Sequence, residues 1–97
     1  MSTIHFEWDE AKNRSNIKKH GVAFDEARTV FYDPSARVID DPGHSEKEDR
    51  FIILGVSHTL RLLVVCHCYR AWDEAIRIIS ARKATATEKK FYERMFA

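Results

Sequence analysis

The segment from Ile76 to Glu88, Ile-Arg-Ile-Ile-Ser-Ala-Arg-Lys-Ala-Thr-Ala-Thr-Glu, decides how the chain folds. Its first half is rich in β-branched residues, with an arginine between isoleucines, which is typical of a strand. Its second half ends in Thr85-Ala86-Thr87-Glu88, which fits the capping box that opens a helix. A strand therefore leads directly into a helix, and Arg82 and Lys83 lie at the junction, where side chains can leave the core and meet a ligand. The alternative is that both are ordinary boundary charges.

Length and composition describe one small domain over residues 1–97. A chain of 97 residues with 44% hydrophobic and 32% charged residues can build one hydrophobic core, as soluble globular proteins do. No apolar run reaches the roughly 18 residues of a membrane span, and the N-terminus lacks a signal-peptide profile. We therefore expect a cytoplasmic protein that does not contact membranes.

The net charge of +1 hides an uneven distribution. Acidic residues concentrate in the middle of the chain, whereas cations gather towards both ends. A local basic face can attract phosphate even when the whole molecule is nearly neutral. The cations are Lys12, Arg14, Lys18 and Lys19 in the first part of the chain, and Arg77, Arg82, Lys83, Lys89, Lys90 and Arg94 in the last part.

Cysteine and histidine spacing does not favour a metal site. Cys66 and Cys68 lie two apart in an apolar run, so on a strand they share one face and are poorly placed for a mutual disulfide. His67, His58 and His44 lie nearby, but neither C-x-x-C nor H-x-x-x-H spacing is present. We expect buried thiols, no metal and no cofactor.

The first half of the chain predicts a strand and two helices. Alternation from Ile4 to Trp8 predicts a half-buried strand with Ile4, Phe6 and Trp8 on its inner face. Asp9 fits an N-cap and Gly21 a helix end, which predicts a helix over residues 10–20. Residues 24–32 predict a second helix whose apolar stripe, Phe24, Ala27, Val30 and Phe31, is core.

The first predicted helix carries a polar stripe. Lys12, Asn16 and Lys19 fall on one side at helical spacing, and His20 lies beside them at the C-terminal end. This arrangement favours a basic, hydrogen-bonding surface. The alternative is a solvent-facing side that needs charge only for solubility.

The second half predicts a short strand over residues 37–40, a surface loop over 41–49, and a meander of strands over 50–56, 62–69 and 75–81. In the middle strand we expect Leu62, Val64, Cys66 and Cys68 to face the core. The other face, with His67 and Tyr69, could floor a groove with Arg70 at its rim; a buried, hydrogen-bonded His67 is the alternative. The last helix places Phe91, Tyr92, Met95 and Phe96 on one side, to dock on the sheet or meet a partner.

Five segments in this order resemble the BrnT family of toxins, and together they cover nearly the whole chain. They are Phe6-Glu7-Trp8-Asp9, Lys19-His20-Gly21-Val22, Val30-Phe31-Tyr32-Asp33-Pro34, Glu48-Asp49-Arg50-Phe51 and residues 76–85. The resemblance implies an α+β, RelE-like fold with two N-terminal helices packed on a mostly antiparallel sheet and a C-terminal helix. It also implies the toxin of a type II toxin–antitoxin system, a metal-independent endoribonuclease that inhibits translation. Its implied partners are an RNA substrate and a BrnA-like ribbon-helix-helix antitoxin, with operator DNA reached only through the antitoxin complex.

Ribonuclease chemistry without a metal needs a positioned 2′-hydroxyl, two proton transfers and stabilisation of charge on phosphorus. Guanidinium suits the last task because it offers a rigid fork and stays protonated. We assign Arg82 and Arg70 to the phosphate, His20 to acid or base and Lys19 to electrostatic support, while Tyr92 stacks on a base, shares a proton or packs in the core. The predicted RNA-binding residues are Lys12, Asn16, Arg77, Lys83 and Lys89.

Two other functions remain open. The first is a non-catalytic RelE-like domain that binds a partner protein and assists transcriptional autorepression. The second is a nucleic-acid-binding protein that leaves RNA or DNA intact and binds it with a steep salt dependence. A phosphate-binding glycine loop is not present among the three glycines.

Overall fold

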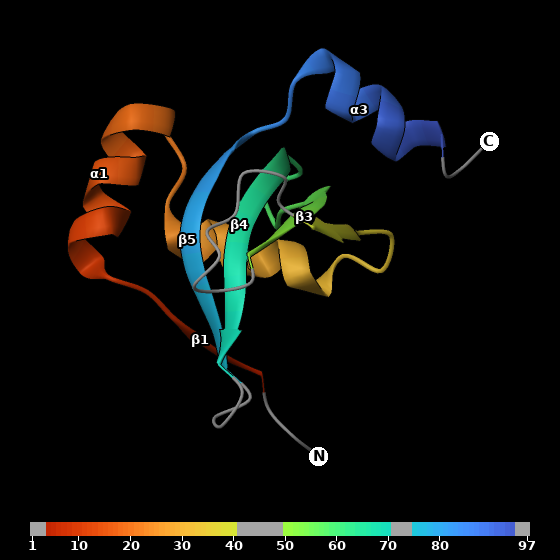
Figure 1. Ribbon diagram of the computed structural model, residues 1–97. Coiled ribbons are helices and arrows are strands. Elements are labelled where there is room, and N and C mark those ends of the chain that lie inside the picture. The colour runs from red at the N-terminus through yellow and green to blue at the C-terminus, as the bar shows by residue number, and fades with distance from the viewer. Residues whose placement is uncertain (1–3, 41–49, 71–74, 95–97) are drawn as a thin grey trace.

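The structure is a computed structural model that describes residues 4–40, 50–70 and 75–94. Within these residues, helices surround a five-stranded sheet with the strand order β1-β5-β4-β3-β2 (Figure 1). The β1–β5 pair is parallel and the other pairs are antiparallel, so the predicted meander is confirmed and β2 extends it. The predicted surface loop over 41–49 and the residues Met95 and Phe96 lie outside the described residues. The strands are β1 (His5–Glu7), β2 (Arg37–Asp40), β3 (Phe51–Val56), β4 (Leu62–Arg70) and β5 (Ala75–Lys83).

Capping residues close to the helix ends set the bounds of the two longer helices. Helix α1 (Glu10–His20) has Asp9 as its N-cap and ends at Gly21, which adopts the left-handed conformation with φ 71°. Helix α3 (Ala86–Glu93) opens with the predicted capping box of Thr85 and Glu88. The second predicted helix is instead a single α-turn, α2 (Phe24–Ala27), that tightens into the 3₁₀ helix η1 (Arg28–Tyr32). None of the helices in the described residues is long and apolar enough to cross a membrane.

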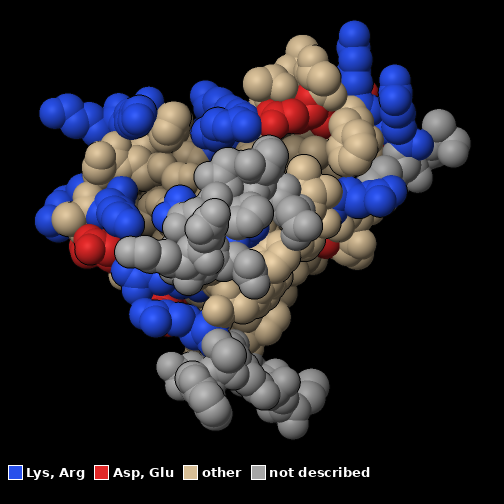
Figure 2. Space-filling view, viewed as in Figure 1, with Lys and Arg blue, Asp and Glu red and all other residues tan. Residues whose placement is uncertain are grey.

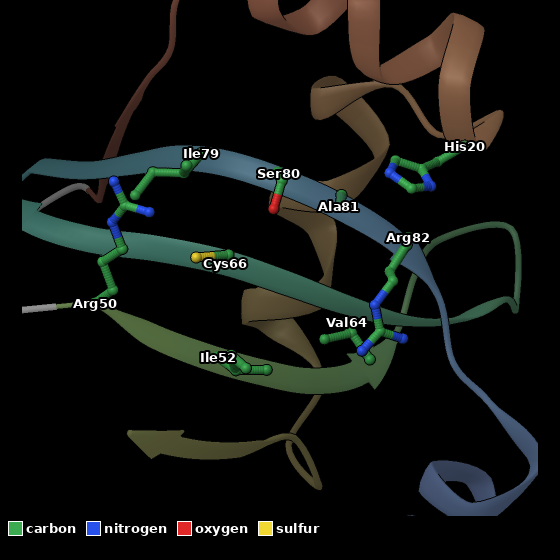
Figure 3. Close-up of a pocket in the computed structure, with 9 residues that line it drawn as sticks. All are labelled: His20, Arg50, Ile52, Val64, Cys66, Ile79, Ser80, Ala81 and Arg82. Carbon is green, nitrogen blue, oxygen red and sulfur yellow. The ribbon is translucent and has the colours of Figure 1, made fainter. Parts of the chain in front are cut away.

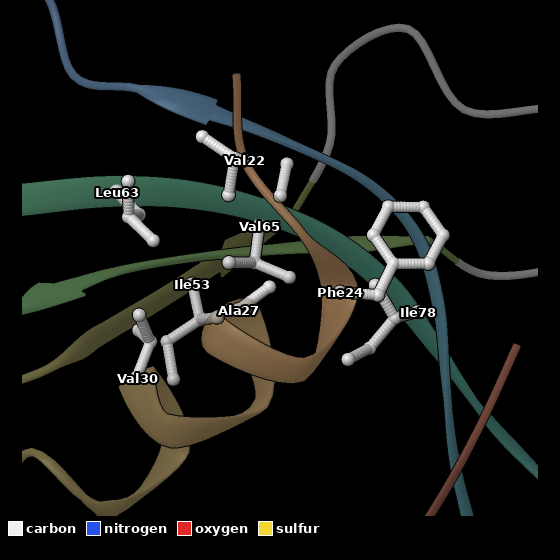
Figure 4. Packing of buried hydrophobic residues seen from close by; sticks show 9 residues of the cluster. Val22, Phe24, Ala27, Val30, Ile53, Leu63, Val65 and Ile78 are labelled. Carbon is white, nitrogen blue, oxygen red and sulfur yellow. The ribbon is translucent and has the colours of Figure 1, made fainter. Parts of the chain in front are cut away.

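The main core lies between one face of the sheet and the α2–η1 segment (Figure 4). Phe6 and Trp8 pack against it from β1 and its continuation, as their alternation predicts. The prediction for Ile4 is wrong: its side chain is 42% exposed, because it precedes β1, a strand of only three residues at the edge of the sheet. The buried members of this core are Val22, Phe24, Ala27, Val30, Ile53, Leu63, Val65, Ile78 and Ala81.

The prediction of which β4 face meets this core is also wrong. Leu63, Val65 and His67 are fully buried there. The His67 imidazole lies edge-on to Phe31 with ring centroids 4.8 Å apart, and its Nδ1 and Nε2 lie 3.2 Å from the Val65 carbonyl and 3.3 Å from the Tyr69 hydroxyl. Burial lowers the pKa of His67, which favours the neutral form of the ring. His67 therefore supports the fold and does not floor a groove.

The opposite face of the sheet is covered only in part. Leu54, Val64 and Tyr92 form a second, smaller cluster where α3 packs on β3. The sheet is thus buried on both faces at one end, which makes both alternating sets of β4 apolar. The part of this face that α3 leaves uncovered carries the pocket described below.

A β-bulge in β5 changes which side chains point to this second face. His67 pairs with Ile78 and Cys66 with Ser80, so Ile79 is an extra residue in β5. Ile78 and Ala81 therefore both lie in the main core, three positions apart. As a result Arg82, the next residue, lies on the opposite face.

Candidate active site

A cavity of about 400 Å³ opens on the second face of the sheet, beside the C-terminal end of α1 (Figure 3). Its floor is formed by β3, β4 and β5, and its polar groups are an imidazole, two guanidinium groups, a thiol and a hydroxyl. Such a mixture of cations and proton-transfer groups suits an anionic ligand. The lining residues are His20, Arg50, Ile52, Val64, Cys66, Ile79, Ser80, Ala81 and Arg82.

His20 reaches the pocket because α1 is fastened to the edge of β5. One turn before His20, the buried Asn16 amide donates from Nδ2 to the carbonyls of Val22 and Ala81, both at 2.8 Å. Its Oδ1 accepts from the Ala81 N–H at 3.1 Å. Residues four apart lie on the same side of a helix. Because Asn16 contacts Ala81, His20 lies beside the next residue of β5, Arg82.

One residue of the predicted polar stripe on α1, Asn16, is buried and not on the surface. Asn16 is only 7% exposed and its amide is used by the backbone, so it has no surface from which to bind RNA. Lys12 and Lys19 are exposed, as a basic stripe requires. Lys19 precedes His20 directly, whereas Lys12 lies two turns away, near the other end of the helix.

A second network fixes the turn that follows His20. The Arg61 guanidinium donates from Nη2 to the Gly21 carbonyl at 3.2 Å and forms an ion pair with Glu26. The Glu26 carboxylate also accepts from the hydroxyls of Ser57 at 2.7 Å and Thr59 at 2.6 Å. This network ties the β3–β4 hairpin to α2 and to the end of α1.

Arg82 extends across β4 towards Val64, its partner in the strand register (Figure 3). Its Nη1 and Nη2 donate to the two carboxylate oxygens of Glu88 at 2.8 and 2.9 Å, and Nη1 also donates to the Lys83 carbonyl at 3.2 Å. The Glu88 hydrogen bonds raise the pKa of Arg82, and those of Arg82 lower the pKa of Glu88 to about 2. The arginine side chain remains 40% exposed, so it is fixed in place while still open to solvent.

Sequence reasoning did not assign a role to three polar residues of the pocket. Arg50 precedes β3 and lies at the far end of the cavity from His20 (Figure 3), while Cys66 and Ser80 face each other across the β4–β5 pair. Cys66 is partly exposed, whereas Cys68 is buried, and both thiols are free of disulfides. For Arg50 the sequence holds one signal, its place in a segment that resembles the BrnT family.

Arg70 and Arg77 do not lie at this pocket. Both belong to the opposite end of the β4–β5 pair, where they form ion pairs with Glu7 at 3.4 and 3.6 Å. Arg70 is six residues along β4 from Val64, which corresponds to roughly 20 Å. The prediction that Arg70 and Arg82 meet one phosphate is therefore wrong, because the two strands run antiparallel.

Tyr92 also faces away from the pocket. Its hydroxyl donates to Asp33 Oδ2 at 2.6 Å, and the same carboxylate accepts from the N–H groups of Val56 at 2.8 Å and Ser35 at 2.9 Å. Burial together with the Asp33 hydrogen bond raises the pKa of Tyr92 to about 12. Tyr92 thus packs α3 against the sheet, which is the alternative given above for this residue.

Basic side chains gather over two of the helices. Figure 2 shows Lys and Arg gathered over α1 on one side and over α3 on the other. Lys83 at the end of β5 and Lys89 on α3 are exposed, as an RNA-binding role requires. Within the described residues, no group of three or more His, Cys, Asp or Glu side chains comes together in a way that could hold a metal ion.

Comparisons with a family model and with a solved structure point to the same family. Residues 8–88 match the protein family described as "Ribonuclease toxin, BrnT, of type II toxin-antitoxin system". The chain is also similar to the ribonuclease toxin BrnT of Brucella abortus, known from a crystal structure at 1.1 Å resolution, with 29% identity and a TM-score of 0.65. That similarity covers 86% of this chain and 99% of the Brucella chain. No curated protein matches the chain.

Proposed function

Because this chain belongs to the BrnT family of ribonuclease toxins of type II toxin–antitoxin systems, we propose that it is an endoribonuclease with its active site at the pocket of His20, Arg50 and Arg82. The observation that carries the proposal is the convergence of one imidazole and two guanidinium groups, from three separate parts of the chain, on one cavity. Phosphate is the anion that such a set is suited to bind.

The proposed reaction is attack of a ribose 2′-hydroxyl on the adjacent phosphorus. A bond forms from O2′ to phosphorus and the bond from phosphorus to O5′ breaks, which leaves a 2′,3′-cyclic phosphate and a 5′-hydroxyl. One proton leaves O2′ and one reaches O5′; His20 performs one of these transfers, as base or as acid, and water serves the other. This scheme uses no metal ion.

Each basic residue has a separate role in binding RNA or in stabilising charge. Arg82 binds the reacting phosphate and stabilises the charge that develops on it, because a fixed guanidinium costs no reorganisation during the reaction. Arg50, at the far end of the cavity, binds the neighbouring phosphate. Lys19 supports the site electrostatically, while Lys83 and Lys89 bind the RNA backbone on the α3 side.

The cellular role follows from the family. We propose that the protein has a RelE-like fold, cleaves RNA in the cytoplasm and thereby inhibits translation. We further propose that a BrnA-like ribbon-helix-helix antitoxin neutralises it and carries the complex to operator DNA. A groove of about 270 Å³ between α3 and the β2–β3 edge supports a protein partner, because Ile39 and Phe91 in its lining are 49% and 46% exposed.

The test compares purified variants for RNA cleavage. We expect His20→Ala and Arg82→Ala each to cleave RNA about 10²–10⁴-fold more slowly than the parent, the range for loss of an acid–base or oxyanion-type group. Arg70→Ala is the matched control, since it removes an exposed strand arginine at the other end of the sheet, and it should keep the parent's rate. If His20→Ala and Arg82→Ala both cleave at the parent's rate, the site is wrong.

One observation favours a non-catalytic, partner-binding role as the second candidate. Arg82 already has a full ion pair with Glu88, as a purely structural arginine would. In that case inducing the parent chain alone would neither stop growth nor cut RNA, while the antitoxin would still bind it. Growth arrest that depends on His20 would exclude this candidate.

A further inference from the structure

We infer that Glu88 is a positioning residue of the active site: it holds the Nη1–Nη2 edge of the Arg82 guanidinium so that the adjacent Nε–Nη2 edge is presented to the RNA phosphate. The inference rests on the proposed function of the pocket and deepens it. Glu88 lies outside the residues that line the cavity, and the sequence marks it only as part of a capping box.

The hydrogen-bond donors of Arg82 divide into used and available sets. A guanidinium has five N–H donors. Glu88 takes one from Nη1 and one from Nη2, and the Lys83 carbonyl takes the second from Nη1. In the part of the chain that the structure describes, two donors remain, the Nε–H and the second N–H of Nη2. These two lie on one edge of the planar group and form a second fork, which matches two phosphate oxygens.

Glu88 is itself immobilised. Its Oε1 accepts from the Thr85 N–H at 2.8 Å, and its own N–H donates to Thr85 Oγ1 at 3.2 Å. The carboxylate is 29% exposed and belongs to the first turn of α3, whose N-terminal dipole favours a negative charge. A fixed carboxylate holding two donors leaves the guanidinium one orientation, whereas a free arginine side chain would sample many rotamers.

Because Glu88 is negatively charged, a positioning role and simple electrostatics predict opposite effects of its removal on the rate of cleavage. A carboxylate beside an RNA site repels phosphate, so its removal should strengthen RNA binding by simple electrostatics. If Glu88 competed with phosphate for Arg82, its removal would also speed cleavage. Positioning predicts the opposite for the chemical step: slower cleavage despite equal or tighter binding, because misplacing a catalytic group by about 1 Å can cost up to ~100-fold in rate.

The experiment measures single-turnover cleavage of an RNA oligonucleotide and, separately, binding of the same oligonucleotide with 2′-O-methyl groups that prevent cleavage. Glu88→Gln is the test variant, because glutamine still serves in a capping box but cannot accept from both Nη groups of Arg82. Glu93→Gln is the matched control, since it makes the same change of charge on the exposed side of α3 and leaves the Arg82–Glu88 pair and the Thr85 cap intact. We expect Glu88→Gln to cleave about 10- to 100-fold more slowly with unchanged or tighter binding, and Glu93→Gln to stay near the parent's rate.

Two results would overturn the inference: Glu88→Gln cleaving as fast as the parent or faster, or Glu93→Gln losing as much rate as Glu88→Gln. Failure of the proposed function is a separate outcome, because it would show as an Arg82→Ala variant that keeps the parent's rate. A second measurement does not depend on variants. The Arg82 Nε–H resonance should shift when the methylated RNA binds the parent protein, and an unmoved resonance under saturating RNA would also refute the proposed fork.

Discussion

The Asn16 side-chain amide pairs with both backbone groups of Ala81, donating to its carbonyl at 2.8 Å and accepting from its N–H at 3.1 Å. Ala81 lies beyond the part of β5 that pairs with β1, since β1 pairs with β5 only along residues 75–77. The amide therefore makes the hydrogen bonds that a neighbouring strand would make, and it satisfies the backbone groups at the edge of β5 that faces α1. This contact sets the distance between the helix that carries His20 and the strand that carries Arg82.

Replacing Asn16 by alanine should destabilise the fold. The variant leaves the Ala81 N–H and the carbonyls of Ala81 and Val22 without their buried partner, which we expect to lower the free energy of unfolding by about 2–4 kcal/mol. Urea denaturation followed by circular dichroism measures the loss. Lys12→Ala on the exposed side of α1 is the control and should stay within about 0.5 kcal/mol of the parent. Equal stability of the two variants would contradict the role given to Asn16.

Stability should fall in acid through Glu26. Hydrogen bonds from Arg61 lower the pKa of Glu26 from 4.5 to about 2, and those from Thr59 and Ser57 add to the effect. A carboxylate whose pKa is lower in the folded state than in the unfolded state contributes its full stabilisation when the pH is above the unfolded-state pKa. For Glu26 this stabilisation is lost as the pH falls from about 4.5 to about 2.

Urea midpoints measured between pH 7 and pH 2 test this expectation. Glu26→Gln should be less stable than the parent at pH 7 and should show a shallower decline in acid. The decline should not vanish, because the pKa of Glu88 also lies at about 2. Glu93→Gln, on the exposed side of α3, controls for the loss of one negative charge. A Glu26→Gln curve parallel to that of the parent would refute the assignment.

Two glycines should respond differently to alanine. A Cβ at Gly55 would lie 2.9 Å from Ala36 Cβ and from Val30 Cγ1, and 3.1 Å from Asp33 Oδ2, so Gly55→Ala should cost about 1–3 kcal/mol through overpacking. A Cβ at Gly21 would meet no other part of the described chain within 4 Å, but φ is +71°, so Gly21→Ala should cost about 1 kcal/mol through backbone conformation.

Asparagine separates the two causes. Gly21→Asn should recover part of the loss, since asparagine tolerates the left-handed region, whereas Gly55→Asn should be worse than Gly55→Ala because the side chain is larger. Thermal unfolding of the four variants gives the comparison. The opposite ranking at either position would show that its glycine serves another purpose.

Tyr92→Phe should affect stability and spare catalysis. The variant removes a hydrogen bond to a charged carboxylate and keeps the ring, so we expect a loss of about 1.5–3 kcal/mol. Below its melting temperature it should cleave RNA at the parent's rate, because the hydroxyl belongs to Asp33 and not to the pocket. A drop in rate comparable to that of His20→Ala would restore a catalytic role for Tyr92.

Elements with local signals are predicted correctly from the sequence. Helix α1 has a side-chain cap at Asp9 and a left-handed end at Gly21, and α3 has the Thr85–Glu88 box, all within a few residues of the ends they define. Strand β2 occupies the predicted residues 37–40. His20 and Arg82, which were assigned to one site from the sequence, line the same pocket, and their catalytic roles stay predictions.

Features that depend on distant contacts are not predictable in this way. Both alternating sets of β4 are apolar, so nothing local shows that Leu63, and not Val64, faces the main core. The bulge at Ile79 is equally hidden, although uninterrupted alternation from Ile78 would have turned Arg82 into the core. Asn16 resembles any polar helix residue until Ala81, 65 positions away, is placed beside it.

The Arg82–Glu88 pair makes the proposed site depend on the folding of α3. All nine residues that line the cavity precede Glu88 in the chain, and Glu88 belongs to the first turn of α3. Local unfolding of this helix would therefore leave the cavity on the sheet while releasing its arginine. Under the proposed function, mild heat or denaturant should abolish RNA cleavage before it unfolds the sheet.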